Sequence, residues 1–86
     1  MAKELNKVEL IGTVKKIIAD NDKVCKFTLD VPTTTPNNKI SHAFVMCADF
    51  NGNHVAEGDN VKLVGRLSTN SYNGKFTVLV VIDNIV

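Results

Sequence analysis

Two phenylalanines in one apolar segment are spaced so that their flat rings could hold a row of planar groups. Phe44 and Phe50 are six residues apart. Residues an even number apart in a β-strand project from the same face, and six residues span about 20 Å at ~3.3 Å per residue. Rings displayed in this way can stack on unpaired nucleotide bases of any sequence. Such rings also form protein cores and subunit interfaces, so the spacing alone leaves both interpretations open.

Cations are the second requirement for holding a nucleic-acid strand, because the strand's backbone is anionic. Lys26, Lys62 and Arg66 stand at strand positions whose alternation predicts exposure, and Lys75 follows a predicted turn. Lys15 lies near a predicted bend. For any single lysine, ordinary solvated charge explains the position equally well. The predicted nucleic-acid-binding residues are Phe44, Phe50, Tyr72, Lys26, Lys62, Arg66 and Lys75.

Five strand-like segments divided by turn residues must position these side chains. The predicted strands cover residues 7–18, 23–31, 40–50, 60–69 and 75–85. Residues 32–39 are predicted to form a loop, because their two prolines cannot donate to a strand ladder. Asn73 and Gly74 are a strong hairpin-turn signal. The link from residue 51 to residue 59 has room for at most one or two helical turns.

Alternation within these segments predicts the core. Phe27 shares the parity of the other apolar residues in its strand, so we expect it to be buried. In the fourth segment one face carries Val61, Leu63, Gly65 and Leu67. Glycines inside strands mark sharp bends, which suit a small closed barrel better than an open sheet. The pattern predicts an all-β barrel, either an OB fold or an SH3-like barrel, and does not choose between them.

The cysteines and histidines do not form a recognisable metal motif. Cys25, Cys47, His42 and His54 include no pair with zinc-ligand spacing such as C-x2-C or H-x3-H. We therefore predict no metal and no cofactor, two buried free thiols that are neighbours across the second and third strands, and two surface histidines. No phosphate-binding loop or nucleophile motif is present. The sequence accordingly predicts neither an enzyme nor a small-molecule substrate.

Length and composition limit the remaining possibilities. The chain has 86 residues, of which 44% are hydrophobic and 22% charged, as expected for one globular domain over residues 1–86. The net charge of +1 gives no support for binding through phosphates alone. Residues 1–7 lack the apolar run of a secretory signal, and no stretch has transmembrane length. We expect a cytoplasmic protein with no membrane partner.

Two stretches resemble the bacterial single-stranded DNA-binding protein family. Residues 6–14 (NKVELIGTV) resemble the family's first strand. Residues 57–72 (EGDNVKLVGRLSTNSY) resemble its glycine turn, its V-x-hydrophobic-x-G-R-L strand and the aromatic residue six positions after the arginine. The resemblance implies an OB fold, stacking roles for Phe44, Phe50 and Tyr72, and non-enzymatic, sequence-tolerant single-stranded DNA binding in replication, recombination or repair. It further implies replication proteins as additional partners.

The opening strand also resembles that of the primosomal replication-restart proteins, which share the fold. This second resemblance implies an alternative function, a protein-assembly module that binds single-stranded DNA weakly. The link between the third and fourth strands is shorter than in the DNA-binding family, so we expect a five-stranded OB-fold barrel with little or no helix there. The third and fifth strands are apolar on both faces. A small barrel cannot bury both sides of two strands, which favours self-association as a homodimer or homotetramer.

Overall fold

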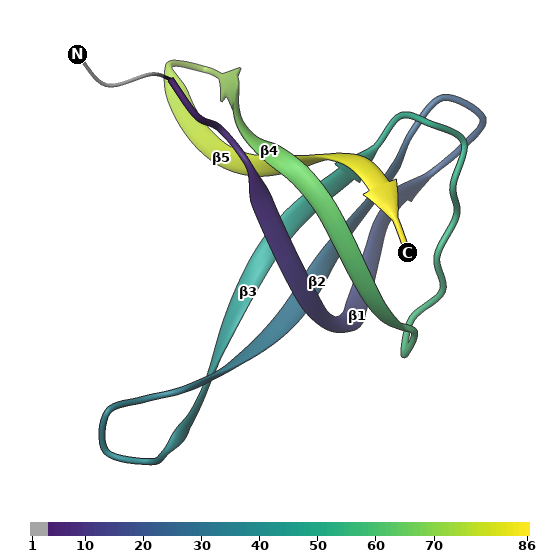
Figure 1. Cartoon of the computed structure of the whole chain (residues 1–86). Coiled ribbons are helices and arrows are strands. Elements are labelled where there is room, and N and C mark those ends of the chain that lie inside the picture. Colours follow the sequence, from purple (N-terminus) through teal and green to yellow (C-terminus); the bar gives the residue numbers. More distant parts are fainter. Residues whose placement is uncertain (1–3) are drawn as a thin grey trace.

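Five strands form a closed barrel in the computed structural model, which describes residues 4–86. The strands are β1 (Val8–Asp20), β2 (Cys25–Thr34), β3 (Ile40–Asp49), β4 (Asn60–Tyr72) and β5 (Lys75–Ile85). Their order around the barrel is β1-β2-β3-β5-β4, and β4 pairs again with β1 (Figure 1). Only the β3–β5 pair is parallel. The all-β barrel prediction is confirmed.

The prediction of little or no helix is also confirmed, because the described residues 4–86 contain only strands, turns and bends. Among them no helix has the length and apolar character that crossing a membrane requires. The expectation about residues 1–7 falls partly on residues 1–3, which lie outside the described residues.

The barrel interior is filled by inward-facing side chains of all five strands. The largest fully buried hydrophobic residues are Val14, Phe27, Leu29, Leu63, Val80 and Ile82. Phe27 is 0% exposed, which confirms its predicted place in the core. Gly12 and Gly65 lie close to the backbone of neighbouring strands, where a Cβ atom would overlap the carbonyl oxygens of Asp30 and Val81 respectively.

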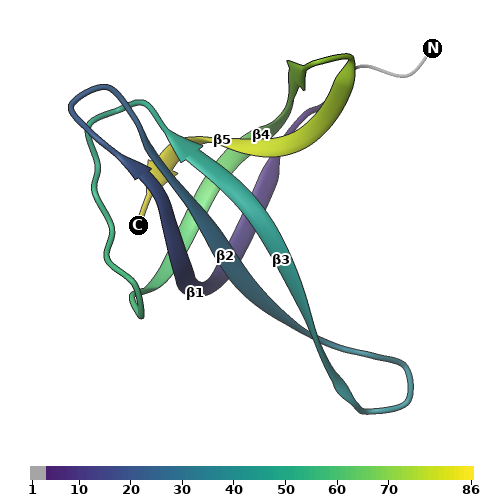
Figure 2. The same cartoon turned by 180° about the vertical axis from the view of Figure 1, so that it is seen from behind.

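The β2–β3 hairpin extends well beyond the barrel (Figures 1 and 2). β2 and β3 stay paired as far as Thr34 and Ile40, whereas β1 pairs with β2 only as far as Asp30. Residues 32–34, predicted as loop, are therefore strand, and the loop covers only residues 35–39. The prediction was wrong because Pro32 lies where β2 has lost its pairing with β1, and an unpaired strand edge tolerates proline.

The β4–β5 hairpin is also longer than predicted. β4 continues to Tyr72, which pairs with Lys75 across a two-residue turn at Asn73 and Gly74. Both turn residues have positive φ, 51° and 75°, as a type I′ turn requires, so the turn prediction is confirmed. β1 covers β4 only to Gly65. Leu67 shares the predicted face with Leu63 but is 50% exposed, because the barrel wall has ended there.

Residues 50–59 connect β3 to β4 without a helix, although the sequence left room for one or two helical turns there. The connection is fixed at its far end by backbone hydrogen bonds to β1. Gly58 N donates to Val14 O at 2.8 Å, and Val14 N donates to Asp59 O at 2.8 Å. β3 ends at Asp49, so Phe50 lies just past the strand rather than within it. The connection runs beside the β1–β2 turn in both views (Figures 1 and 2).

Candidate nucleic-acid interface

Each of the three predicted stacking side chains is exposed. Phe44 and Phe50 are both 57% exposed, and Tyr72 is 76% exposed. None of the three rings contributes to the barrel core. Their exposure is therefore compatible with stacking on a bound base.

Phe44 has a lysine directly over its ring. Lys15 Nζ lies 4.7 Å from the ring centroid, within the range of a cation–π contact. Lys15 stands at an irregularity of the β1–β2 ladder, between Val14 and Lys16, where a bulge re-aims the side chain. Asp30 lies opposite Phe44 on β2, and its Oδ1 is 2.7 Å from His42 Nδ1. The carboxylate next to the Phe44 ring is therefore in direct contact with the imidazole of His42.

Phe50 shares a surface depression with Lys26. The depression has a volume of about 250 Å³ and lies between β2, the start of the connection after β3 and the β4–β5 hairpin. Its other lining residues are Ser68, Thr69, Asn70, Leu79 and Val81. Hydroxyl and amide groups thus line one side of the depression, while a ring and apolar side chains line the rest. A concave surface of this mixed character suits a planar group with polar edges.

Tyr72 and Lys75 form a cross-strand pair at the tip of the β4–β5 hairpin. Residues directly opposite in an antiparallel pair have Cβ atoms roughly 5 Å apart and project from the same face. Phe76, opposite Ser71, projects from the other face of this hairpin and is also 76% exposed. The hairpin tip therefore presents one ring with a cation on one face and a second ring on the other.

The three rings lie along one path over the outer surface. Tyr72, Asn70 and Ser68 share a face of β4, and the last two line the depression that holds Phe50. The path then continues from Phe50, just past the end of β3, to Phe44 within β3, six residues away. Ser68 and Tyr72 are four positions apart on β4, which spans about 13 Å, and the six positions between the two phenylalanines span about 20 Å. The path is long enough for several nucleotides, with Lys75, Lys26 and Lys15 beside it in turn.

Arg66 and Lys62 have different surroundings. Arg66 Nη1 lies 2.5 Å from Asp83 Oδ1, so its charge is already paired. Lys62 lies opposite Ile11, in the part of β4 that pairs with β1 and away from the hairpin. The structure therefore brings Lys26 and Lys75 together with the predicted rings, and adds Lys15, but does not bring Lys62 to the same path.

Both cysteines are buried and free, as predicted, with Cys25 1% and Cys47 0% exposed. They lie on adjacent strands but not directly opposite each other, since Cys25 faces Asp49 and Cys47 faces Phe27. Burial raises the pKa of the Cys47 thiol to about 12. The two histidines are exposed, as predicted.

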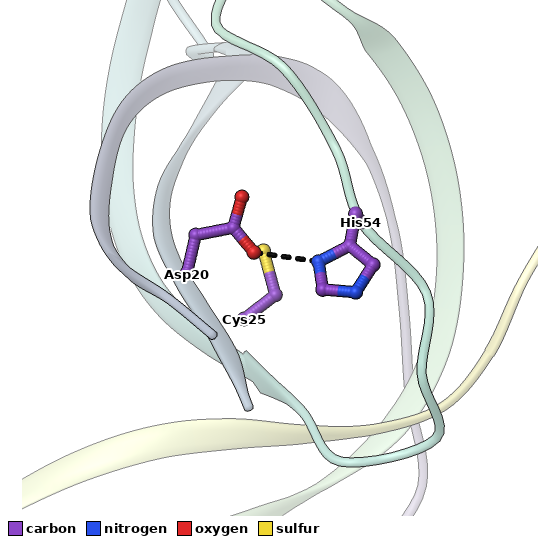
Figure 3. A group of neighbouring side chains, drawn as sticks. All are labelled: Asp20, Cys25 and His54. Carbon is purple, nitrogen blue, oxygen red and sulfur yellow. Dashed lines mark hydrogen bonds and ion pairs between the residues drawn. The ribbon is translucent and has the colours of Figure 1, made fainter. Parts of the chain in front are cut away.

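One cluster was missed by the sequence analysis. Asp20, Cys25 and His54 bring a carboxylate oxygen, a sulfur and an imidazole nitrogen within 4.8 Å of one another (Figure 3). They come from β1, β2 and the β3–β4 connection, so their spacing along the chain forms no motif. A register for the β1–β2 pair could have joined Asp20 to Cys25, but nothing in the sequence points to His54.

No family model matches this chain, and no curated protein matches it either. Solved structures do match over nearly the whole length. The mitochondrial single-stranded DNA-binding protein of S. cerevisiae is 13% identical with a TM-score of 0.72, over 96% of this chain and 94% of that one. Single-stranded DNA-binding protein from Plasmodium falciparum, in complex with single-stranded DNA, is 22% identical with a TM-score of 0.68, over 100% and 96%.

A third similar structure is the dimeric N-terminal domain of PriB protein from Thermoanaerobacter tencongensis. It is 21% identical with a TM-score of 0.56, over 94% of this chain and 93% of that one. Together these likenesses establish the OB fold for this chain and decide against the SH3-like alternative.

Proposed function

We propose that this protein binds single-stranded DNA without reading its sequence and performs no catalysis of its own. The observation that carries the proposal is the pairing of Phe44, Phe50 and Tyr72 each with a lysine along one path, as in Lys15 with Phe44. Stacking tolerates any base because every base has a π-face, and the lysines are available for the phosphates. This combination suits a chain whose net charge is only +1.

The aromatic contribution explains how a nearly neutral protein could bind an anion. Removing a stacking ring from a single-strand-binding protein costs about 1–3 kcal/mol per base. Three rings therefore offer enough binding free energy to make a small number of charges sufficient. The structural neighbours named above, which include a complex with single-stranded DNA, support the same function.

The test is fluorescence anisotropy with labelled oligo-dT, duplex DNA and single-stranded RNA of equal length at two salt concentrations. We expect oligo-dT to bind more tightly than duplex, and Tyr72→Ala to weaken its binding by about 5- to 150-fold, the equivalent of 1–3 kcal/mol. Ile11→Ala is the control, because Ile11 is a 58% exposed apolar residue on the part of β1 that pairs with β4, away from the ring–lysine path. Equal affinity for duplex, or equal loss in both variants, would contradict the proposal.

We further propose that the chain self-associates through the face of the β4–β5 hairpin that carries Phe76. Leu67, Val78 and Phe76 share this face and are 50%, 62% and 76% exposed. Contiguous apolar groups on a surface commonly mark an interface, and the PriB domain named above is dimeric. Light scattering after size exclusion should give a dimer or tetramer mass, and Phe76→Asp together with Val78→Asp should reduce it to a monomer mass.

The alternative, a replication-restart type of assembly module, is favoured by the same apolar face, which could bind another protein instead of a second copy. The two functions separate experimentally. An assembly module should bind oligo-dT only weakly and should show no loss in Tyr72→Ala. For a DNA binder we propose a role on strands exposed during replication, recombination or repair, in the cytoplasm and together with other replication proteins.

A further inference from the structure

Three side chains with the chemistry of zinc ligands converge at the end of the barrel next to the β1–β2 turn. The ligand atoms of Asp20, Cys25 and His54 all lie within 4.8 Å of one another (Figure 3). The nearest contact joins His54 Nδ1 and Asp20 Oδ1 at 2.5 Å. Lys26 of the ring–lysine path directly follows Cys25, but none of the three cluster residues lines the depression or carries a ring, so the proposed DNA-binding function does not account for the cluster.

Asp20 and Cys25 are brought together by the geometry of one hairpin. They form the last pair of the β1–β2 ladder, directly opposite each other. A register shift between Ile17 and Ala19 inserts one extra residue into β1, which puts Asp20 rather than Ala19 opposite Cys25. The Asn21 side chain fixes the turn that follows, because its Oδ1 accepts hydrogen bonds from Lys23 N and Val24 N at 2.8 and 3.1 Å.

His54 is held over this hairpin by a buried carboxylate. Asp49 is 1% exposed and lies opposite Cys25 on the next strand. Its Oδ1 accepts a hydrogen bond from Asn51 N at 2.6 Å, and its Oδ2 accepts one from Asn53 Nδ2 at 3.0 Å. The residue after His54, Val55, packs against the core. Both sequence neighbours of His54, Asn53 and Val55, are therefore held in place. The backbone that carries each of the three cluster residues is fixed by the fold.

We propose that Asp20, Cys25 and His54 form a Zn²⁺ site with one coordination position open to solvent. Zinc takes sulfur, imidazole nitrogen and carboxylate oxygen at about 2.0–2.3 Å, which puts tetrahedral ligand atoms about 3.3–3.8 Å apart. Groups already within 4.8 Å need to move by only about 1 Å. The ion would replace the direct contact between His54 and Asp20.

The donor set also selects the kind of metal. A thiolate and an imidazole favour zinc over Mg²⁺ and Ca²⁺, which prefer oxygen ligands only. The side chains of His54 and Asp20 are 50% and 43% exposed, which gives the ion a route to the buried sulfur of Cys25. A bound ion would join the β1–β2 hairpin to the helix-free connection after β3 and so stabilise that end of the barrel.

The test uses the untagged, reduced protein with Zn²⁺ and, as a spectroscopic probe, Co²⁺. We expect a thiolate-to-cobalt charge-transfer band that Zn²⁺ abolishes. We also expect Zn²⁺ at a hundredfold excess over its Kd to raise Tm by more than about 10 °C. Absence of both the band and the Tm shift would overturn the proposal.

Variants identify the ligands. His54→Ala and Asp20→Asn change exposed side chains and should each weaken Co²⁺ binding at least tenfold while leaving the metal-free Tm nearly unchanged. His42→Ala is the matched control, because His42 forms the same kind of contact with Asp30 at 2.7 Å but is not in the cluster. Cys25→Ser should remove the charge-transfer band, and Cys47→Ala should retain it. Retention of the band in Cys25→Ser, or equal losses in His42→Ala and His54→Ala, would contradict the assignment.

Discussion

The side-chain amide of Asn6 forms two hydrogen bonds with the backbone of Leu67, as a strand residue would. Asn6 Nδ2 donates to Leu67 O at 2.9 Å, and Asn6 Oδ1 accepts from Leu67 N at 2.8 Å. The β1–β4 ladder ends at Val8 and Gly65. Asn6 therefore continues the ladder with a side chain, and it fixes the start of the β4–β5 hairpin against the N-terminal end of β1.

This contact predicts that Asn6→Ala destabilises the protein by about 1–3 kcal/mol, since two hydrogen bonds are lost and each contributes roughly 0.5–1.5 kcal/mol. Urea unfolding followed by circular dichroism gives the change in the free energy of unfolding. Asn37→Ala, an exposed change in the loop between β2 and β3, should alter that free energy by less than about 0.5 kcal/mol. Equal effects of the two substitutions would mean that the Asn6 contact contributes nothing to stability.

Much of the barrel could be predicted from the sequence because alternation records which side of a strand faces the core. β5 was predicted over its full length, and the Asn73-Gly74 turn was predicted because only a few residues tolerate its positive φ. The errors lie where pairing with a third strand ends. Pro32 is in a strand and Leu67 is exposed for this reason, and local alternation carries no information about how far a neighbouring strand extends.

The candidate site was predictable to a similar degree. Parity identified Phe44 as an outward-facing ring, but the lysine over it was not predicted, because Lys15 depends on a bulge in β1 and reaches across β2. Likewise, Lys26 was predicted from its parity, while its shared depression with Phe50 depends on three strands. Side chains such as Asp20 and His54 come together only through strand register, bulges and the path of a connection. Their proximity could therefore be found only from the structure.

The ring–lysine path predicts the salt dependence of DNA binding. If three or four cations contact phosphates, log K against log salt should have a slope of about −2 to −3, from roughly −0.7 per phosphate on a single strand. Lys26→Gln should make the slope shallower by about 0.7. Lys62→Gln, which removes an exposed charge from the β1-paired part of β4, should leave it unchanged. A shallower slope for Lys62→Gln would show that the DNA also crosses that side of the barrel.

The close approach of β5 to Gly65 on β4 predicts that no side chain larger than glycine's fits at this position. A Cβ atom there would overlap the Val81 carbonyl oxygen. This oxygen belongs to the backbone, so no side-chain rotation can relieve the overlap. We expect Gly65→Ala to destabilise the protein by about 1–3 kcal/mol or more, through displacement of β5. Thr69→Ala, at an exposed position further along β4, is the comparison. Thermal unfolding measures both changes, and a Gly65→Ala protein as stable as the wild type would contradict the close approach.

The buried thiol of Cys47 predicts a specific loss of stability in alkali. Burial raises its pKa from 9.0 to about 12 in the folded protein. Below pH 9 the thiol is protonated in both states and its full contribution to stability is present. Between pH 9 and 12 the unfolded chain releases the proton while the folded protein keeps it, so the free energy of unfolding falls as pH rises, by up to about 1.4 kcal/mol per pH unit.

Urea unfolding of the wild type and of Cys47→Ala between pH 8 and 11 isolates this contribution. Both proteins carry the same lysines and tyrosine, so the titration of those groups cancels in the difference between the two free energies. Cys47→Ala should be the less stable at pH 8, because it loses buried contacts, and the gap should narrow above pH 9 as the wild type loses its thiol contribution. A gap that stays constant up to pH 11 would mean that the Cys47 thiol ionises as readily in the folded protein as in the unfolded chain.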